Sequence, residues 1–225
     1  MVETPDDCVR FVNERGIVAW SNGTPLPSVA DATPWGERVM FHTWFWKDDL
    51  HLEKRLCYGQ FWGAGVPLFV SLEMLPALIA AQGDNDPRTL YEAGRLSHLA
   101  LSLYEHVERH GPTPKNRLPY PAKTSQTPPL AQLQQRFLIT KVALTGRTRG
   151  TYGYLWGLCD EFWPEAFAEA AKLSPEEGRE RVLECLRAGG VTISDVKIAR
   201  ALRWDFPQPP PGGGESELAS GRGQQ

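Results

Sequence analysis

The sequence predicts an α+β protein that is mainly helical, and three observations support this prediction. Apolar residues recur at three- and four-residue steps in several segments that begin at capping residues or end at glycines. Two apolar runs, separated by the turn-forming sequence TGRTRG at 145–150, are typical of a β-hairpin. Hydrophobic residues make up 41% and charged residues 23% of the 225 residues, as is usual in soluble globular proteins.

Residues 1–86 are expected to form a helical module rich in aromatic side chains. Thr4 and Pro5 are suited to the start of a helix, and Gly16 is suited to its end. The further elements expected are, in order, an extended segment over 17–20, a helix over 47–62, a strand-like segment over 66–72 and a helix over 74–81. The sequence DNDP at 84–87 marks the boundary to the next unit.

Residues 87–160 follow the element order of a winged helix. A long helix is expected over 90–110, where leucines repeat at helical spacing and Gly111 ends the pattern. The later elements expected are a short helix in the Pro-rich stretch 113–129, a helix over 130–137 and two strands over 138–144 and 151–158. Together these elements describe a helix-turn-helix with a β-hairpin wing, in which the helix before the hairpin is the recognition helix.

Residues 161–205 are expected to form a further helix-turn-helix-like segment. Ser174, Pro175 and Glu177 have the pattern of a capped helix start. Helices are expected over 165–172, from Ser174 to Gly189 and over 195–202. The Pro- and Gly-rich residues 206–225 are expected to be a disordered tail. The predicted architecture is therefore a tandem winged-helix/helix-turn-helix protein with a small β-hairpin wing.

The charges of the chain are unevenly distributed. The net charge is -3, from 24 Lys+Arg and 27 Asp+Glu, yet no Asp or Glu lies between Arg109 and Cys159. Because this acid-free basic stretch includes the predicted recognition helix and hairpin, it indicates a surface for a polyanion, with double-stranded DNA as the expected partner. The nucleic-acid-binding candidates are Arg109, Lys115, Arg117, Lys123, Gln132, Gln135, Arg136, Lys141, Arg147 and Arg149. The alternative is a set of solubilising loop charges on a fold used for protein contacts.

A group of aromatic and acidic residues precedes this stretch. A base-excision enzyme needs aromatic rings that stack on an extruded base and a carboxylate that holds a water. The stacking candidates are Trp44, Trp46 and Tyr58, and the catalytic candidates are Asp48, Asp49 and Glu53. The alternative, which the pattern fits well, is a hydrophobic core with a charged helix face outside it.

Metal, redox and membrane functions have little support in the sequence. The four cysteines are scattered without a C-x-x-C pair, which argues against a zinc ribbon and a redox centre. His106 and His110 could share a metal, but Glu108 is not at the position that the zincin signatures require. No metal or cofactor is therefore expected. No apolar run spans a membrane and no secretion signal precedes the first helix, so a cytoplasmic protein is expected. The sequence does not determine its oligomeric state.

Several short stretches resemble one family of DNA repair enzymes. They are TPDDCVRFVNERG at 4–16, WKDDL at 46–50, YEAGRLSHL at 91–99 and LQQRFLITK at 133–141. In these stretches and in its layout, the chain is similar to winged-helix proteins related to the AlkZ/YcaQ-type DNA glycosylases, which unhook interstrand crosslinks. The resemblance implies tandem winged helices around a positively charged channel, with DNA as the partner.

The resemblance does not extend to the catalytic motif of that family, which is Gln-x-Gln or Gln-x-Asp in the N-terminal region. The comparable stretch, Ile17–Asn22, contains neither Gln nor Asp. Gln132 and Gln134 have the spacing, but they belong to the predicted recognition helix, so the catalytic role is not carried over. The preferred interpretation is a winged-helix DNA-binding protein without its own catalytic centre. The alternatives are a DNA glycosylase acting on alkylated or crosslinked bases and a protein-interaction scaffold.

Overall fold

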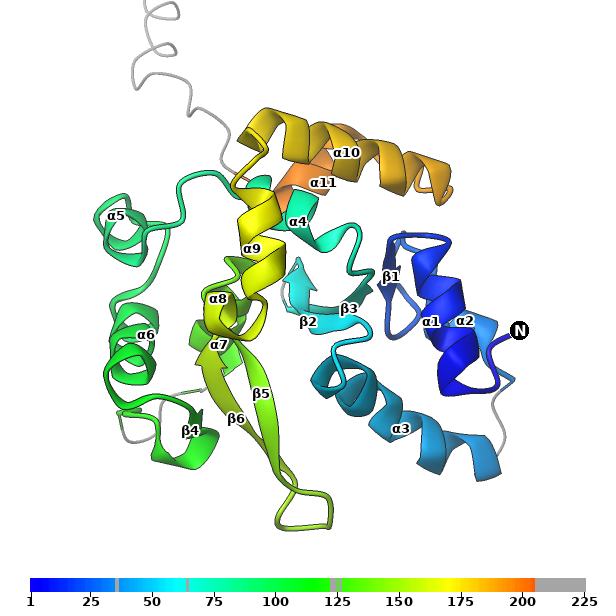
Figure 1. Cartoon of the computed structure of the whole chain (residues 1–225), viewed down its shortest axis with the longest axis horizontal. Coiled ribbons are helices and arrows are strands. Elements are labelled where there is room, and N and C mark those ends of the chain that lie inside the picture. The colour runs from blue at the N-terminus through cyan, green and yellow to red at the C-terminus, as the bar shows by residue number, and fades with distance from the viewer. Residues whose placement is uncertain (35–36, 64, 122–124, 126, 205–225) are drawn as a thin grey trace, which may run out of the picture.

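A computed structural model describes the positions of most of the chain (Figure 1). The described residues are 1–34, 37–63, 65–121, 125 and 127–204, without the side chains of 35–43 and 127. Within these ranges there are eleven α-helices, one 3-10 helix and two three-stranded antiparallel sheets, which confirms the predicted α+β class. The predicted tail at 206–225 and Lys123 lie outside the described residues.

The first sheet is built from the N-terminal part of the chain. Its strands have the spatial order β1-β3-β2, so the last strand lies between the other two. In this order Ile17 and Cys57 both pair with Val70 of the central strand. The elements of this region are α1 (Pro5–Asn13), β1 (Ile17–Ala19), α2 (Val29–Ala32), α3 (Glu37–Leu52), β2 (Cys57–Trp62) and β3 (Val66–Val70).

The helix predicted over residues 47–62 is wrong in its second half. Helix α3 ends at Leu52, the chain turns through Lys54 at a φ of 55°, and residues 57–62 form strand β2. Tyr58 packs with Phe69 in one hydrophobic core cluster, whereas Phe61 packs in another. Because both faces of the strand are buried, its burial does not alternate along the chain, and such a segment is not distinguished from a helix by periodicity.

The second sheet has the same spatial arrangement as the first. Its order is β4-β6-β5, again with the last strand between the other two. Strands β5 and β6 form the predicted hairpin and project to one end of the molecule (Figure 1). The elements are α5 (Pro87–Glu92), α6 (His98–His110), β4 (Thr113–Pro114), the 3-10 helix η1 (Lys115–Arg117), α7 (Thr127–Gln135), β5 (Ile139–Gly146) and β6 (Gly153–Leu158).

The single helix predicted over residues 90–110 is wrong, because the chain forms two helices there. Gly94 has a φ of 69°, which ends the first helix, and the Ser97 hydroxyl accepts a hydrogen bond from the Ala100 N–H at the start of the second. Leu90 and Leu96 are both buried in one core cluster. The leucine spacing therefore reflects a shared core rather than one continuous helix, and Arg95 lies in the loop between the two helices.

The remaining helices pack over the first sheet in the largest core cluster. Helix α10 lies close to α4, where a Cβ on Gly178 would be 2.7 Å from the Ala77 carbonyl oxygen and the Ala81 nitrogen. The predicted capping box at its start is confirmed, with Ser174 and Glu177 as its members. These helices are α4 (Leu75–Ala80), α8 (Cys159–Phe162), α9 (Pro164–Ala170), α10 (Pro175–Ala188) and α11 (Asp195–Ala201).

Within the described ranges, no helix combines the length and the apolar composition that crossing a bilayer requires.

Candidate nucleic-acid interface

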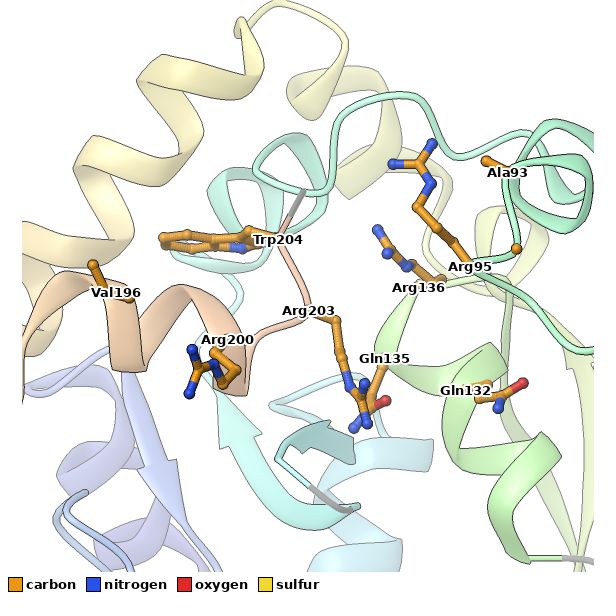
Figure 2. A pocket seen from close by; sticks show the side chains of 10 residues that line it. Ala93, Arg95, Gln132, Gln135, Arg136, Val196, Arg200, Arg203 and Trp204 are labelled. Atoms are coloured by element: carbon orange, nitrogen blue, oxygen red, sulfur yellow. The ribbon is translucent and has the colours of Figure 1, made fainter. Parts of the chain in front are cut away.

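A groove with a volume of about 940 Å³ lies where three separate segments meet (Figure 2). We call it the arginine groove, because all the charged side chains among its described lining residues are arginines. The loop after α5, the second half of α7, and α11 with the residues after it form its walls. The lining residues are Ala93, Gly94, Arg95, Gln132, Gln135, Arg136, Val196, Arg200, Arg203 and Trp204. Four guanidinium groups from segments far apart in sequence thus share one concave surface.

Hydrogen bonds to two intervening residues hold the walls of the groove together. The Gly63 N–H donates to the Ala201 carbonyl oxygen at 2.7 Å, and the Gln135 side-chain amide donates to the Gly63 carbonyl oxygen. The buried Gln82 amide donates to the Leu202 carbonyl oxygen at 3.2 Å, while its oxygen accepts a hydrogen bond from the Arg136 guanidinium at 3.4 Å. The ends of α7 and α11 are therefore positioned by the same neutral amides and backbone groups.

Arg136 lies deepest among the arginines of the groove, with only 6% of its surface exposed. Burial, reinforced by the nearby Arg95, Arg203 and Arg179, lowers the pKa of Arg136 to about 10. The guanidinium therefore remains charged at neutral pH. Like charges nearby raise the electrostatic cost of burying this cation. Arg200 and Arg203 are exposed, so the positive charge extends from the interior of the groove to its rim.

The predicted hairpin residues lie in two different environments. Arg147 and Arg149 are exposed in the turn between β5 and β6, although Arg147 forms an ion pair with Asp49 of α3. Lys141 of β5 is instead buried, with its ammonium 4.1 Å and 4.5 Å from the ring centroids of Tyr58 and Tyr154. Burial lowers the pKa of Lys141 to about 7. A phosphate could reach the two turn arginines but not the Lys141 ammonium in this arrangement.

Three further predicted cations lie close to β4, an edge strand of the second sheet. Arg109 is exposed in the last turn of α6, and Lys115 and Arg117 belong to η1, where Lys115 is half-buried and Arg117 exposed. None of them lines the arginine groove. Of the ten predicted nucleic-acid-binding residues, the structure therefore places Gln132, Gln135 and Arg136 together in that groove.

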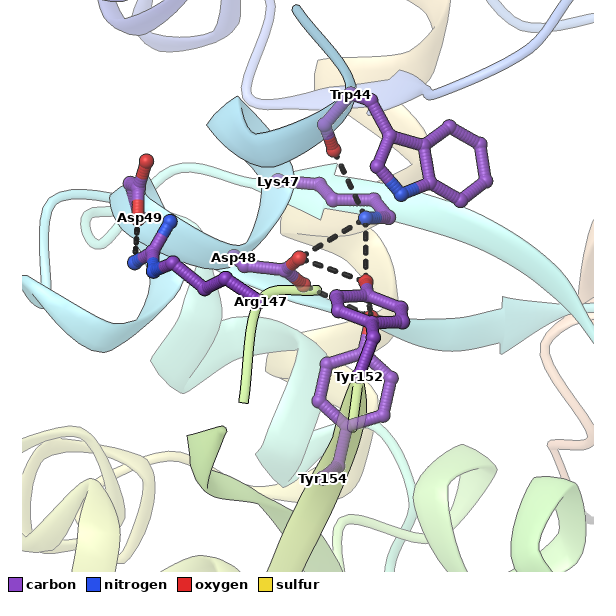
Figure 3. Close-up of polar contacts among 7 residues, drawn as sticks. All are labelled: Trp44, Lys47, Asp48, Asp49, Arg147, Tyr152 and Tyr154. Atoms are coloured by element: carbon purple, nitrogen blue, oxygen red, sulfur yellow. Dashed lines mark hydrogen bonds and ion pairs between the residues drawn. The ribbon is translucent and has the colours of Figure 1, made fainter. Parts of the chain in front are cut away.

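The hairpin and α3 are joined by a buried polar network, which we call the hairpin cluster: Lys47, Asp48, Tyr152 and Tyr154 (Figure 3). The Asp48 carboxylate accepts hydrogen bonds from the Lys47 ammonium at 3.0 Å, the Tyr152 hydroxyl at 2.7 Å and the Tyr154 hydroxyl at 2.8 Å. The Lys47 ammonium also donates to the Tyr152 hydroxyl and to the Trp44 carbonyl oxygen, each at 2.8 Å. Each of these charged and polar groups therefore has a hydrogen-bond partner within the protein.

The three predicted catalytic carboxylates are not brought together at one solvent-accessible point. Asp48 is only 2% exposed and is engaged in the hairpin cluster. Asp49 is half-buried and pairs with Arg147, and Glu53 is exposed just beyond α3. None of them lines the arginine groove. Their role in water activation stays a prediction.

The three predicted stacking residues also differ in their accessibility. Trp46 and Tyr58 are buried in one core cluster with Phe69. Trp44 is 51% exposed, and the Lys47 ammonium lies 4.2 Å from the centroid of its ring. Of the three, only Trp44 therefore offers much of its ring to a ligand.

No group of three or more His, Cys, Asp or Glu side chains suited to a metal ion is found among the described residues. The rings of His106 and His110 lie on consecutive turns of α6, with centroids 4.6 Å apart. They form a pair without a third ligand of these types among the described residues.

The sequence analysis missed Arg95, Arg200 and Arg203, because it searched for cations inside the acid-free stretch. A usable signal was present at the end of the chain. Arg200 lies in the last turn of a short helix and Arg203 follows two residues after its end, so two cations close together in the sequence marked this segment. Arg95 has no comparable local signal, since its position depends on the loop between α5 and α6.

A family model described as "AlkZ related" matches residues 2–203 of the chain. Neither a curated protein nor a solved structure matches it. The matched range includes both sheets, the hairpin cluster and all four arginines of the arginine groove. The match confirms the relationship that the short stretches of sequence indicated. The chain belongs to the AlkZ-related family.

Proposed function

We propose that the protein is a winged-helix DNA-binding protein that holds duplex DNA through the arginine groove and the exposed turn of the β5–β6 hairpin. The observation that carries this proposal is the convergence of four arginines and two glutamines in one groove. Arginine forms paired hydrogen bonds with phosphate oxygens or guanine, and glutamine forms them with adenine. Membership of the AlkZ-related family supports DNA as the polyanion.

The repeated element order supports a tandem winged-helix architecture. A winged helix has the order helix, strand, helix, helix, strand, strand, with the last strand in the middle of its sheet. Elements α1 to β3 and elements α6 to β6 both follow this order, and both sheets have that strand arrangement. We place the units at residues 1–86 and 87–160, followed by the helical segment 161–205. The first unit was expected only as a helical module.

In the second unit α7 is the proposed recognition helix and the β5–β6 hairpin is the proposed wing. Helix α7 carries Gln132 and Gln135, and Arg136 follows directly after its end. Arg147 and Arg149 lie at the tip of the wing, where phosphate contacts position a duplex without reading its sequence. This arrangement favours a role in binding or recruitment at DNA rather than chemistry on the base.

The proposal is tested by titrating a fluorescent duplex with the protein at several salt concentrations. If the four groove arginines meet phosphates, log K should fall with log salt at a slope of about −3.6 or steeper. The variant with Arg200→Gln and Arg203→Gln should lower the magnitude of this slope by about 2. Arg181→Gln is the control, because Arg181 is an exposed arginine of α10 outside the groove.

Two outcomes would contradict the proposal. Absence of duplex binding at low salt would leave a protein-interaction scaffold as the better interpretation. An equal loss per charge removed in the control and in the groove variant would mean that binding depends on net charge rather than on the groove.

Base excision is the second candidate function, favoured by the family relationship and by the exposed ring of Trp44 beside the hairpin cluster. Incubation with alkylated duplex, followed by alkaline cleavage of the abasic sites that base release leaves, measures it. Asp48→Asn and Asp49→Asn should abolish the activity if either carboxylate holds the attacking water. Excision that persists in both variants would exclude these residues as the water-activating groups.

A further inference from the structure

We propose that the exposed ring of Trp44 is a stacking platform for one unpaired nucleobase of DNA, beside the turn of the β5–β6 hairpin. The inference rests on the proposed function, because it takes the DNA that this turn contacts as the ligand. It goes further in naming an unpaired base as the group that is recognised, which phosphate contacts by the groove and the wing do not require.

Trp44 differs from the other tryptophans in its exposure. Of the tryptophans whose side chains the structure describes, it alone is exposed, with 51% of its surface open to solvent. The six-membered part of its indole points away from the side chains of the hairpin cluster (Figure 3). Burying such a ring against a flat apolar partner is favourable, and the partner reaches it from solvent.

The hairpin cluster holds this exposed ring in place. The Lys47 ammonium lies 4.2 Å from the centroid of the Trp44 ring, a distance at which a cation is attracted to the face of an indole. The same ammonium is fixed by hydrogen bonds to the Asp48 carboxylate at 3.0 Å and to the Tyr152 hydroxyl at 2.8 Å. The ring is thus positioned before a ligand arrives, which reduces the entropy that binding costs.

The ring also lies close to the turn through which the wing is proposed to contact DNA. Phe45, the neighbour of Trp44 in α3, packs against Tyr152 of the hairpin with ring centroids 6.0 Å apart. The Arg147 guanidinium of the turn lies 5.5 Å from the centroid of the Phe45 ring. Arg147 and Arg149 are exposed, so a strand whose phosphates meet this turn passes close to Trp44.

The recognised base has to be unpaired, because a continuous duplex offers no free base face. Paired bases stack on one another inside the duplex, and an indole meets such a face only when the base is extruded, bulged or part of a single strand. Every base has a π-face, so stacking accepts any of the four bases. The platform therefore distinguishes unpaired from paired DNA rather than one sequence from another.

The test compares three duplexes with the same ends and the same flanking sequence. One is fully paired, one contains a single bulged nucleotide, and one contains the same bulge with an abasic sugar in place of that nucleotide. The two bulges differ in the base that is able to stack. Fluorescence anisotropy at fixed salt measures the dissociation constants for the full chain. We expect the bulge with its base to bind about tenfold more tightly than the abasic bulge.

Variants then assign this preference to Trp44. Trp44→Leu should remove it, because leucine keeps an apolar side chain but has no ring, whereas Trp44→Phe keeps a smaller ring and should retain part of it. Tyr91→Leu is the matched control, since Tyr91 is a 40% exposed ring on α5, and it should leave the tenfold ratio unchanged. Arg200→Gln with Arg203→Gln should weaken binding to all three duplexes by the same factor.

The outcomes separate this inference from the proposed function. Equal affinity of the wild-type protein for the two bulges, with salt-dependent duplex binding intact, overturns the stacking platform and leaves the proposed function standing. Binding of the bulge with its base and not of the paired duplex supports the platform and overturns the proposed function. A preference that survives Trp44→Leu overturns the placement of the site at this ring. Absence of binding to all three duplexes overturns both and favours a protein partner for the ring.

Discussion

The arginine groove and the hairpin cluster each contain a deeply buried cation, and the described groups around the two cations differ. Lys47 is 4% exposed and lies against the Asp48 carboxylate, the Tyr152 hydroxyl and a backbone carbonyl. Arg136 is buried to a similar degree beside three other arginines and the neutral amide of Gln82. Burial alone therefore does not tell which role a charged side chain has. The groups around a charged side chain have to be known as well.

The two regions also differ in what they connect. The hairpin cluster joins α3 to β6 and its preceding turn through contacts that are complete within the protein. The arginine groove joins the ends of α7 and α11 through backbone and amide groups, which leaves its cations on a concave surface. We therefore expect substitutions in the first region to change stability and substitutions in the second to change binding.

The largest expected effect is on stability and comes from the hairpin cluster. Asp48→Asn removes the carboxylate that compensates Lys47, and breaking a buried ion pair in this way costs about 3–5 kcal/mol. Urea denaturation measures the free energy of unfolding. Asp49→Asn is the control, because its ion pair with Arg147 is partly exposed and contributes about 1 kcal/mol or less. Similar losses in the two variants would refute the distinction between a buried and an exposed pair.

The next effect concerns pH and the buried His51 beside the cluster. Its Nδ1 accepts a hydrogen bond from the Tyr58 N–H and its Nε2 donates to the Lys141 carbonyl oxygen, so the folded state holds the neutral ring. Burial, reinforced by Lys141, lowers the pKa of His51 to about 3, below its ordinary value of 6.5. Between these values the unfolded chain binds the extra proton, so stability falls as the pH is lowered through this window.

The expected slope from His51 is about 1.4 kcal/mol per pH unit. Urea denaturation at several pH values between 4 and 6.5 measures this slope. The same series on the His51→Gln variant separates the contribution of His51 from that of the carboxylates. The variant will be less stable at every pH, but its slope should be smaller. An unchanged slope would show that His51 is protonated in the folded state.

The third prediction concerns two groove arginines, whose substitution should change binding and leave stability nearly unchanged. Arg200→Gln together with Arg203→Gln should change the free energy of unfolding by no more than about 0.5 kcal/mol per site, since both residues are exposed. The same variant should lose duplex affinity. Measuring urea denaturation and anisotropy on one preparation sharpens the comparison between the two regions. Loss of stability comparable to that of Asp48→Asn would place the groove arginines among the structural charges.

The smallest expected effect concerns the turn at the tip of the β5–β6 hairpin. Asp49→Asn releases Arg147 from its ion pair and removes a negative charge from the surface near the turn. Because an exposed pair contributes about 0.5 kcal/mol, the affinity for duplex should rise about twofold. Arg147→Gln combined with Asp49→Asn should abolish the gain. A gain that persists in the double variant would come from net charge rather than from Arg147.

Several elements were predictable from the sequence because their causes are local. The capping boxes of Thr4 with Asp7 and of Ser174 with Glu177 depend on residues three positions apart, and both helices begin where these residues predict. The β5–β6 hairpin was likewise predicted from two apolar runs and the turn between them. The prediction failed at β2, since its burial on two faces depends on elements distant in sequence.

By itself, the sequence determined the helix starts, the hairpin, the exposed arginines of its turn and the resemblance to one family. Only the tertiary structure decided that Lys141 is buried between tyrosine rings, that Asp48 meets Tyr152 across 104 residues, and that Arg95 and Arg203 join Arg136 in one groove. The physical reason is the distance along the sequence between the residues that interact. Capping and turns depend on hydrogen bonds between near neighbours, whereas the environment of a charge is set by segments that folding brings together.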